Sequence, residues 1–290
     1  MKLVTTTGFI GRRLGVKKVL EMIAKSGFDG YDCTMFGVDD EFCPEYVGEN
    51  GLKNIKELKR FADTLGLPCL QAHAPCPSVP KFSTVERYVE TSLQAIRYAH
   101  ELECPILVVH PATEFNEKEN YERIYAPLME SAKSYGVRVA TENMYKWKDE
   151  KEIETVPAAC GTAEDFVNHI DYAKNSYLTA CLDIGHAQMQ NCEGAVKLIK
   201  ALGKERLSAL HVHDNDLCND YHTFPFVGKS DWDEITTALA GIGYDGCFTF
   251  EADAFMRTYP DELLSACLSL LEKTGRYLIK EIERKKARNE

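Results

Sequence analysis

The sequence predicts an α/β protein that forms a single (β/α)8 TIM barrel domain over residues 1–290. Short β-branched or apolar runs alternate with amphipathic segments, and eight such pairs account for the whole chain. A chain of this length is typical of one such barrel. The alternative is a doubly wound open sheet, but no G-x-G-x-x-G sequence follows the first run. The closed barrel is therefore the expected fold.

The first four strand–helix pairs lie in the N-terminal half of the chain. We expect strands at residues 3–7, 28–33, 67–73 and 105–110 and helices at residues 16–24, 52–65, 84–101 and 121–135. Gly66 stands where the second helix should end, and Ser83 or Thr84 could cap the third helix. The unbroken apolar run before His110 predicts a strand that is buried on both faces.

The last four pairs repeat this pattern. We expect strands at residues 137–142, 178–183, 207–213 and 246–251 and helices at residues 163–173, 194–202, 232–239 and from 261 into the C-terminal tail. The fifth strand is followed by a loop of about seventeen residues, which is longer than usual between a strand and a helix. Because this loop follows a barrel strand and carries Trp147, we expect residues 145–160 to form a lid.

Composition and charge exclude several classes of partner. Lys and Arg total 34 and Asp and Glu total 45, so the net charge of −11 argues against a nucleic-acid partner. No apolar run approaches the roughly 18 residues that span a bilayer, so no membrane partner is expected. The N-terminus lacks the apolar segment of a signal peptide, which predicts a cytoplasmic location. Eleven scattered cysteines without a C-x-x-C pair predict free thiols rather than disulfides.

Polar residues with catalytic potential gather at the ends of the expected strands. His100 and His169 fall inside expected helices, and we interpret them as ordinary surface or core residues. The other six histidines follow strand ends and are His73, His110, His186, His211, His213 and His222. Six acidic residues share this position and are Glu142, Asp183, Asp214, Asp216, Asp220 and Glu251. In a (β/α)8 barrel the C-terminal strand ends form one rim, which is where active sites lie.

Four of these residues come from four consecutive expected strands, namely Glu142, Asp183, His211 and Glu251. Carboxylates placed close together repel one another, so some of them would be protonated at neutral pH unless a cation lay between them. Three carboxylates and one imidazole suit Mn²⁺, Mg²⁺, Co²⁺ or Zn²⁺. We therefore expect one divalent metal ion at this rim, with Mn²⁺ as the first choice. For any one of these acids alone, a solvated loop position is the simpler interpretation.

Short motifs at the strand ends carry a family resemblance. They are QAHAP at 71–75, VHP at 109–111, TEN at 141–143, LDIGH at 182–186, HVHDN at 211–215, DYH at 220–222 and FE at 250–251. Together they resemble the xylose isomerase-like TIM barrels, a superfamily of sugar and sugar phosphate isomerases and epimerases that also contains endonuclease IV (AP endonuclease family 2). The resemblance covers nearly the whole chain, to about residue 255.

The resemblance implies roles for the rim residues. In sugar epimerases of this superfamily, one metal ion is held by the positions that match Glu142, Asp183, His211 and Glu251. The position that matches His186 contacts substrate oxygens. In endonuclease IV, a three-zinc cluster also uses the positions that match His73, His110, His186, Asp220 and His222. We assign to substrate binding or to additional metal ions the residues His73, His110, His213, Asp220 and His222.

The expected function is that of a metal-dependent isomerase or epimerase acting on a sugar, a sugar phosphate or an inositol derivative. The metal ion would stabilise an enediolate, and Glu142 and Glu251 would transfer the proton as catalytic residues. His186 would orient a substrate oxygen as the third catalytic residue. The acidic balance favours a small carbohydrate over DNA, and so does the absence of a basic and aromatic cluster after His73 and His110.

Three alternatives stay open. They are an endonuclease IV-like zinc phosphodiesterase, a metal-dependent sugar lyase that uses the same carboxylate pair, and a sugar-binding barrel with a structural metal. Ketose 3-epimerases carry an arginine and a glutamate where this chain has Leu217 and Lys148, so that particular activity is not predicted. Lys229 and Arg257 are candidates for contacting a substrate phosphate. The resemblance also implies a homo-oligomer, either a dimer or a tetramer.

Overall fold

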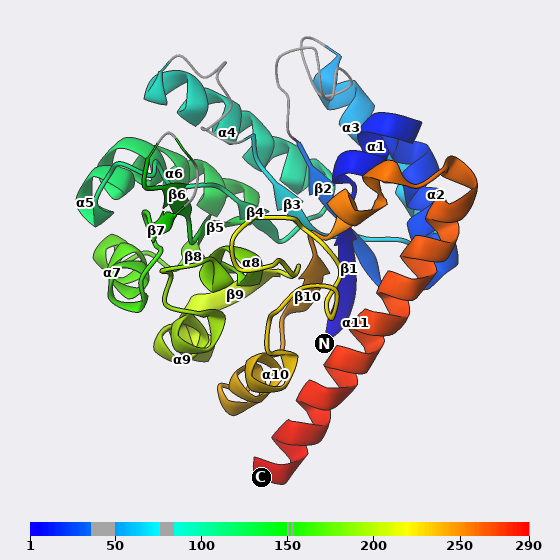
Figure 1. The fold of residues 1–290 in the computed structure, drawn as a ribbon. Helices are drawn as coiled ribbons and strands as arrows, with labels where there is room; N and C mark the ends of the chain where they lie inside the picture. Colours follow the sequence, from blue (N-terminus) through cyan, green and yellow to red (C-terminus); the bar gives the residue numbers. More distant parts are fainter. Residues whose placement is uncertain (36–49, 76–83, 150, 152–153, 290) are drawn as a thin grey trace.

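The computed structural model describes residues 1–35, 50–75, 84–149, 151 and 154–289, and these residues form the predicted barrel (Figure 1). Its eight parallel strands are β1 (Lys2–Thr6), β2 (Gly30–Thr34), β3 (Cys69–His73), β4 (Ile106–Val108), β5 (Arg138–Glu142), β8 (Leu178–Asp183), β9 (Leu207–His211) and β10 (Cys247–Phe250). Each strand pairs with the next one along the chain, and β10 pairs with β1. All eight strands predicted from the sequence are confirmed within a few residues.

The barrel closes between β9 and β10. Just beyond β9, Val212 N donates a hydrogen bond to Thr249 O at 2.8 Å, and Glu251 N donates to Val212 O at 3.2 Å. Val212 thereby forms a parallel bridge with Phe250. The alternative of an open, doubly wound sheet is wrong, because both edges of the sheet find a partner.

Helices surround the ring of strands (Figure 1). The longer ones are α2 (Val16–Ser26), α3 (Gly51–Thr64), α4 (Val85–Glu101), α6 (Ala126–Tyr135), α7 (Ala163–Ala173), α9 (Ala195–Arg206), α10 (Trp232–Gly241) and α11 (Asp261–Asn289). Thr84 caps α4, and its hydroxyl accepts a hydrogen bond from Arg87 N at 3.1 Å. Ser83, the other cap residue considered, lies outside the described residues. Before α6, the chain passes through α5 (Glu117–Asn120) and a π-helical turn at Tyr121–Tyr125.

Three short elements were not expected from the sequence. They are α1 (Gly8–Leu14), α8 (Ile184–Gln188) and the 3₁₀ helix η3 (Asp253–Thr258). Each is too short to show a helical hydrophobic period, which needs a window of about eleven residues or more. All three follow strands and lie at the C-terminal rim of the barrel.

The core has two parts. A large cluster lies between the strands and the surrounding helices, and a small one of strand residues fills the barrel interior: Ile106, Val108, Ala140, Cys181 and Ala209. Leu107 belongs to the outer cluster, so β4 is buried on both faces, as its unbroken apolar run predicts. The nine cysteines in the described ranges are all free thiols. No helix within those ranges is long and apolar enough to cross a bilayer.

The long loop after β5 contains a hairpin. Strands β6 (Tyr145–Trp147) and β7 (Thr155–Pro157) pair antiparallel, with Tyr145 opposite Pro157. The expectation that residues 145–160 form a loop without strands is therefore wrong. Residues 150, 152 and 153 of that segment lie outside the described ranges.

Candidate metal centre

The four residues predicted to hold a metal ion lie together at the C-terminal rim. Glu142, Asp183 and His211 are the last residues of β5, β8 and β9, and Glu251 directly follows β10. The four residues each offer a ligand atom, and these atoms all lie within 4.8 Å of one another. Parallel strands bring them together because their C-terminal ends share one rim. Glu251 is 16% exposed, and the other three side chains are buried.

The separations between these ligand atoms fit a single cation. His211 Nδ1 lies 3.1 Å from Glu142 Oε1 and 3.2 Å from Glu251 Oε2. The same nitrogen lies 3.9 Å from Asp183 Oδ2. Metal–ligand bonds of about 2.1 Å place neighbouring ligand atoms about 3.0–3.4 Å apart at octahedral or tetrahedral angles. Glu142 Oε2 is buried and accepts no hydrogen bond from any described residue. Burial of a carboxylate oxygen without a partner costs free energy, and a cation bound to this oxygen would remove that cost.

Charges within this buried group compensate one another. Burial by itself would raise the pKa of Glu142, but His211 and His110 hold that pKa well below its ordinary value. Burial by itself would lower the pKa of His211, but Cys181 and the two nearby glutamates raise that pKa well above its ordinary value. The group therefore favours one positive charge at its centre, which either a proton on His211 or a metal ion can supply.

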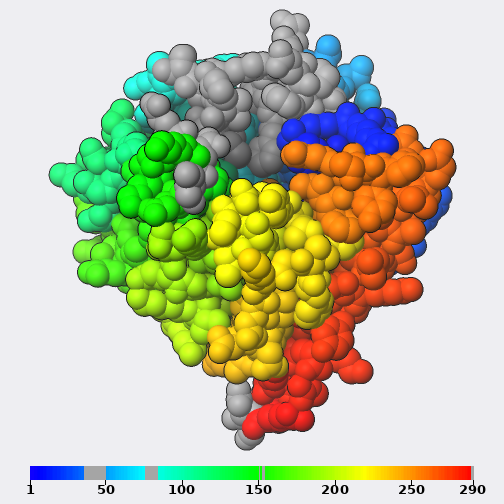
Figure 2. All heavy atoms as spheres, in the orientation of Figure 1, coloured from blue at the N-terminus to red at the C-terminus, as the bar shows by residue number. Residues whose placement is uncertain are grey.

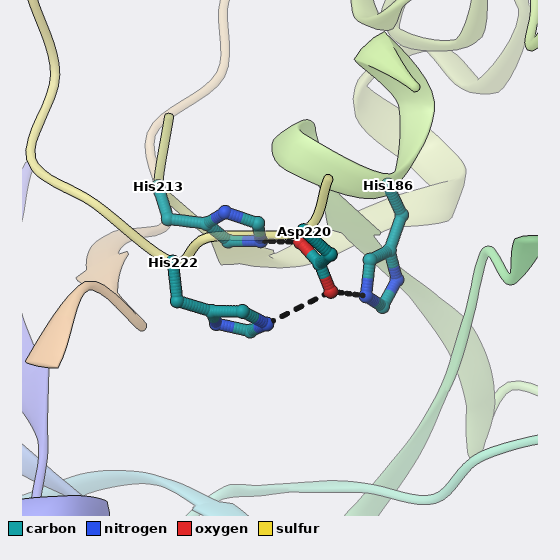
Figure 3. Close-up of side chains that lie close together, drawn as sticks. All are labelled: His186, His213, Asp220 and His222. Carbon is teal, nitrogen blue, oxygen red and sulfur yellow. Dashed lines mark hydrogen bonds and ion pairs between the residues drawn. The ribbon is translucent and has the colours of Figure 1, made fainter. Parts of the chain in front are cut away.

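A second group of ligands adjoins the first and consists of His186, His213, Asp220 and His222 (Figure 3). Asp220 Oδ2 lies 3.0 Å from His222 Nε2 and 3.2 Å from His186 Nε2. The other oxygen of Asp220 lies 3.7 Å from His213 Nε2. His213 Nε2 also lies 3.0 Å from Asp183 Oδ1, and this contact connects the second group with the first.

The LDIGH motif positions residues of both groups. Asp183 Oδ1 accepts a hydrogen bond from His186 N at 2.7 Å and so caps the short helix α8. Gly185 lies in the same turn and packs against the His213 ring. A Cβ atom at position 185 would lie 1.9 Å from His213 Cε1, so only glycine leaves room for that ring.

A third group shares Glu142 with the first and adds His73 and His110. His110 Nε2 lies 3.0 Å from His73 Nε2 and 3.1 Å from Glu142 Oε2. His73 Nδ1 is 2.7 Å from Ala74 O, and donation to that carbonyl leaves the Nε2 of a neutral His73 as an acceptor. Two imidazole lone pairs that face each other repel, so a proton or a cation must lie between them. All the predicted rim ligands thus fall into three adjoining groups.

A cavity of about 760 Å³ lies above the ligand groups, within the size range of small-molecule sites. Rim residues on its surface are His110, Glu142, His186, Asp220, His222 and Glu251. One side is the hairpin, with Tyr145, Lys146 and Trp147, and another side is formed by α1 and η3. The Tyr145 ring lies edge-on to His186, with ring centroids 5.2 Å apart. Figure 2 shows this face, with the hairpin in green, the loop after β9 in yellow, η3 in orange and α1 in blue.

The sequence matches the family described as xylose isomerase-like TIM barrel over residues 20–268. The chain belongs to this family. One relative is protein MJ1311 of Methanocaldococcus jannaschii, which is 26% identical over 246 residues that cover 80% of this chain and 77% of the relative. Another is protein y4fM of Sinorhizobium fredii, which is 29% identical over 172 residues that cover 56% of this chain and 52% of the relative.

Solved structures of other proteins have the same barrel fold as this chain. A D-tagatose 3-epimerase-like protein superimposes with a TM-score of 0.67 at 24% identity and covers 94% of this chain and 99% of its own. The IOLI protein, whose structure contains a bound zinc atom, gives a TM-score of 0.72 at 16% identity and covers 97% of this chain and 99% of its own. At these identities the likeness shows a common fold.

Asp32 lies beside the ligand His211 and was not predicted from the sequence. It lies in β2 and is buried. Its Oδ2 accepts a hydrogen bond from Gln71 Nε2 at 2.9 Å and lies 3.7 Å from His211 Nε2, on the side of the ring away from Glu142. A carboxylate behind a ligating imidazole orients the ring and raises its basicity. An acid in the middle of a buried strand was the sequence signal that could have revealed it.

Asp253 is a second residue that was missed. It follows Glu251 by two positions, is buried and lines the cavity. Burial raises the pKa of Asp253 to about 6, although its carboxylate accepts a hydrogen bond from Phe9 N. Its position two residues beyond Glu251, at the end of the last strand, is the sequence signal that could have revealed it.

Two predicted rim acids have structural roles, and the two histidines expected in helices lie away from the cavity. Both Asp214 and Asp216 accept backbone hydrogen bonds in the loop after β9, and Asp214 is buried. His100 bonds Tyr135 O, and the buried His169 lies between Asp165 and Asn120, so neither reaches the cavity. Of the two suggested phosphate contacts, Arg257 lines the cavity and Lys229 does not.

Proposed function

We propose that this protein is a metal-dependent isomerase or epimerase that acts on a sugar, a sugar phosphate or an inositol derivative. One divalent cation, with Mn²⁺ as the first choice, would be held by Glu142, Asp183, His211 and Glu251. The observation that carries the proposal is that Glu142 and Glu251 belong to one four-ligand group and both line the cavity. Family membership supports it, and several structural neighbours are sugar epimerases.

The proposed chemistry is a proton transfer between two carboxylates. When bound, a divalent cation would polarise a substrate carbonyl and acidify the neighbouring C–H bond. Glu142 and Glu251 approach His211 Nδ1 from β5 and from the end of β10. One carboxylate would remove the proton and the other would return it, on the opposite face for epimerisation or at the adjacent carbon for isomerisation. His186 would orient a substrate oxygen, and Asp183 would act as a ligand without a proton role.

The hairpin β6–β7 would serve as the lid that keeps water from the intermediate. Its residues Tyr145, Lys146 and Trp147 line the cavity, and the Trp147 ring lies edge-on to Tyr145 with ring centroids 6.0 Å apart. The position where ketose 3-epimerases carry a glutamate lies further along this hairpin. Here it is Lys148, which pairs with Glu154 at 2.7 Å and does not line the cavity. The ketose 3-epimerase reaction of some neighbours is therefore not part of the proposal.

Turnover with defined metals tests the proposal. We expect EDTA to abolish conversion of a panel of ketoses, sugar phosphates and inosose compounds, and Mn²⁺ to restore it. Glu142→Gln and Glu251→Gln should each lower kcat by about 10²–10⁴-fold with the fold intact. The control is Glu154→Gln, which changes a hairpin carboxylate that does not line the cavity. Glutamine variants that bind metal and keep full turnover would show that the two-carboxylate mechanism is wrong.

A metal-dependent phosphodiesterase is a second candidate function. The observation that favours it is the continuity of the three ligand groups, which Glu142 and the contact between Asp183 and His213 connect. Three adjoining cations could clamp a phosphate diester and activate a water molecule. Metal content separates the two candidates, since three zinc ions per chain together with cleavage of an abasic-site duplex support the phosphodiesterase. One metal ion per chain with no such cleavage supports the isomerase.

A further inference from the structure

Two arginines stand on the cavity wall that α1 and η3 build. Arg12 and Arg257 both line the cavity, and both guanidinium groups lie over the Phe9 ring. The Arg257 guanidinium carbon is 3.6 Å from the centroid of that ring, and the Arg12 carbon is 4.9 Å from it. Stacking of this kind holds a guanidinium in place.

Contacts between α1 and η3 fix this wall relative to the metal ligands. The Asp253 carboxylate accepts a hydrogen bond from Phe9 N, and Asp253 comes two residues after Glu251. Arg13 Nη1 donates to Tyr259 O at 2.8 Å, directly after η3. The stacked arginines are thus attached to the segment that carries one of the proposed proton-transfer groups.

Within the described ranges, no acidic side chain forms a salt bridge with Arg257. A third cation on the cavity, Lys146, differs in this respect because it pairs with Glu114 at 3.1 Å. A stacked arginine at a cavity wall is suited to bind a planar or tetrahedral anion through two N–H groups.

We propose that Arg257 binds an anionic group of the substrate, either a phosphate ester or a carboxylate at the end of the sugar. This inference rests on the proposed function, because it places the reacting carbons of the same molecule at the metal ligands. The substrate class is then a sugar phosphate or a sugar acid rather than a neutral sugar.

Calorimetric binding of three matched compounds tests the proposal: D-glucose, D-glucose 6-phosphate and D-glucuronate. They share one ring and differ only at the sixth carbon. With the full chain and Mn²⁺, we expect at least one anionic compound to bind at least tenfold more tightly than D-glucose. A phosphate preference identifies a phosphate ester as the source of the anion, and a glucuronate preference identifies a sugar acid. We expect the preference to persist when EDTA removes the metal.

Variants assign the preference to the arginine. Arg257→Gln should lose at least tenfold in affinity for the preferred anion, and Arg257→Lys should lose less because it retains the charge. The matched control is Arg123→Gln, because Arg123 also stacks on a phenylalanine, at 4.3 Å from the Phe115 ring, but does not line the cavity. Equal affinities of Arg257→Gln and the wild type, or a preference that disappears with EDTA, would overturn the proposal.

Failure of this inference is distinct from failure of the proposed function. If sugars are converted but neutral and anionic compounds bind equally, the anion site is wrong and the isomerase proposal stands. If no sugar is converted but Arg257→Gln still loses the anion preference, the isomerase proposal is wrong and the anion site stands.

Discussion

Gly185 lets two of the ligand groups adjoin because it has no side chain that would displace the His213 ring. Any Cβ atom there would overlap the His213 ring, and His213 contacts both Asp183 and Asp220. We expect Gly185→Ala to displace that ring and to lower metal affinity by about 10–100-fold, which is the usual cost of disturbing groups around a metal ligand. Competition of a fluorescent chelator for Zn²⁺ or Mn²⁺ measures the affinity.

Gly241 provides the matched control for this substitution. It is the last residue of α10, and no atom lies within 4 Å of the place that its Cβ would occupy. Gly241→Ala should leave metal affinity unchanged and raise the free energy of unfolding by up to about 1 kcal/mol. Equal metal affinity of Gly185→Ala and the wild type would show that the position of the His213 ring does not matter for metal binding.

Among the elements, the loop after β9 depends on one buried acid. Asp214 Oδ2 accepts hydrogen bonds from Phe226 N at 3.0 Å, Gly228 N at 3.2 Å and Trp232 Nε1 at 2.9 Å. This arrangement holds the loop that carries Asp220 and His222 over the cavity. Asp214 is thus a structural residue, although its position beside the HVHDN histidines suggested metal chemistry.

Replacing this acid should loosen the loop. Asp214→Asn would turn an amide NH₂ group toward backbone donors, and we expect the free energy of unfolding to fall by about 2–3 kcal/mol. Urea unfolding followed by tryptophan fluorescence measures the change. Asp216→Asn, in the same loop but only partly buried, should cost less than about 1 kcal/mol. If the two variants lose the same stability, the loop does not depend on Asp214.

The hairpin β6–β7 is the second element with a predicted role. Trp147→Ala should raise KM or lower kcat several-fold, because Trp147 lines the cavity and packs on Tyr145. Steady-state kinetics on a converted compound of the sugar panel measure both constants. Deletion of the hairpin tip with no change in kcat or KM would exclude a lid.

At the scale of the whole molecule, Asp29 connects the ends of the chain. Its carboxylate accepts hydrogen bonds from Leu3 N at 2.7 Å and from Arg276 Nη1 at 2.7 Å, and thereby joins β1 to α11. Burial by itself would raise the pKa of Asp29, but Arg276 and the Leu3 amide lower it below its ordinary value. A lowered folded-state pKa stabilises the fold above the unfolded-state pKa of about 3.9, and this contribution is lost as pH falls through the folded-state pKa.

Asp29→Asn should therefore lower the free energy of unfolding by about 1 kcal/mol, with the same difference at every pH from 5 to 8. Urea unfolding across that range measures it. Asp63→Asn breaks an exposed pair with Lys59 and should cost less than about 0.5 kcal/mol. A difference for Asp29→Asn that vanishes already at pH 5 would contradict the lowered pKa.

The barrel and the location of its site were predictable because they depend on local signals. A short β-branched or apolar run marks each strand, and strand ends such as Glu142 and His211 share the rim of any closed parallel barrel. The short elements α1, α8 and η3 were not predictable, since helices of five to seven residues have too few turns to show a period. The cavity wall that α1 and η3 form was not predictable for the same reason, although Arg257 itself was a candidate phosphate contact.

What the sequence by itself determined is which residues reach the rim, because strand periodicity and strand ends are local properties of the chain. Only the tertiary structure decided which of those residues touch. Glu142 serves two ligand groups, Asp32 stands behind His211, and Asp214 holds a loop instead of a ligand position. Each of these outcomes depends on strand register and on loop path, which bring side chains together from distant parts of the chain and leave no periodic trace in the sequence.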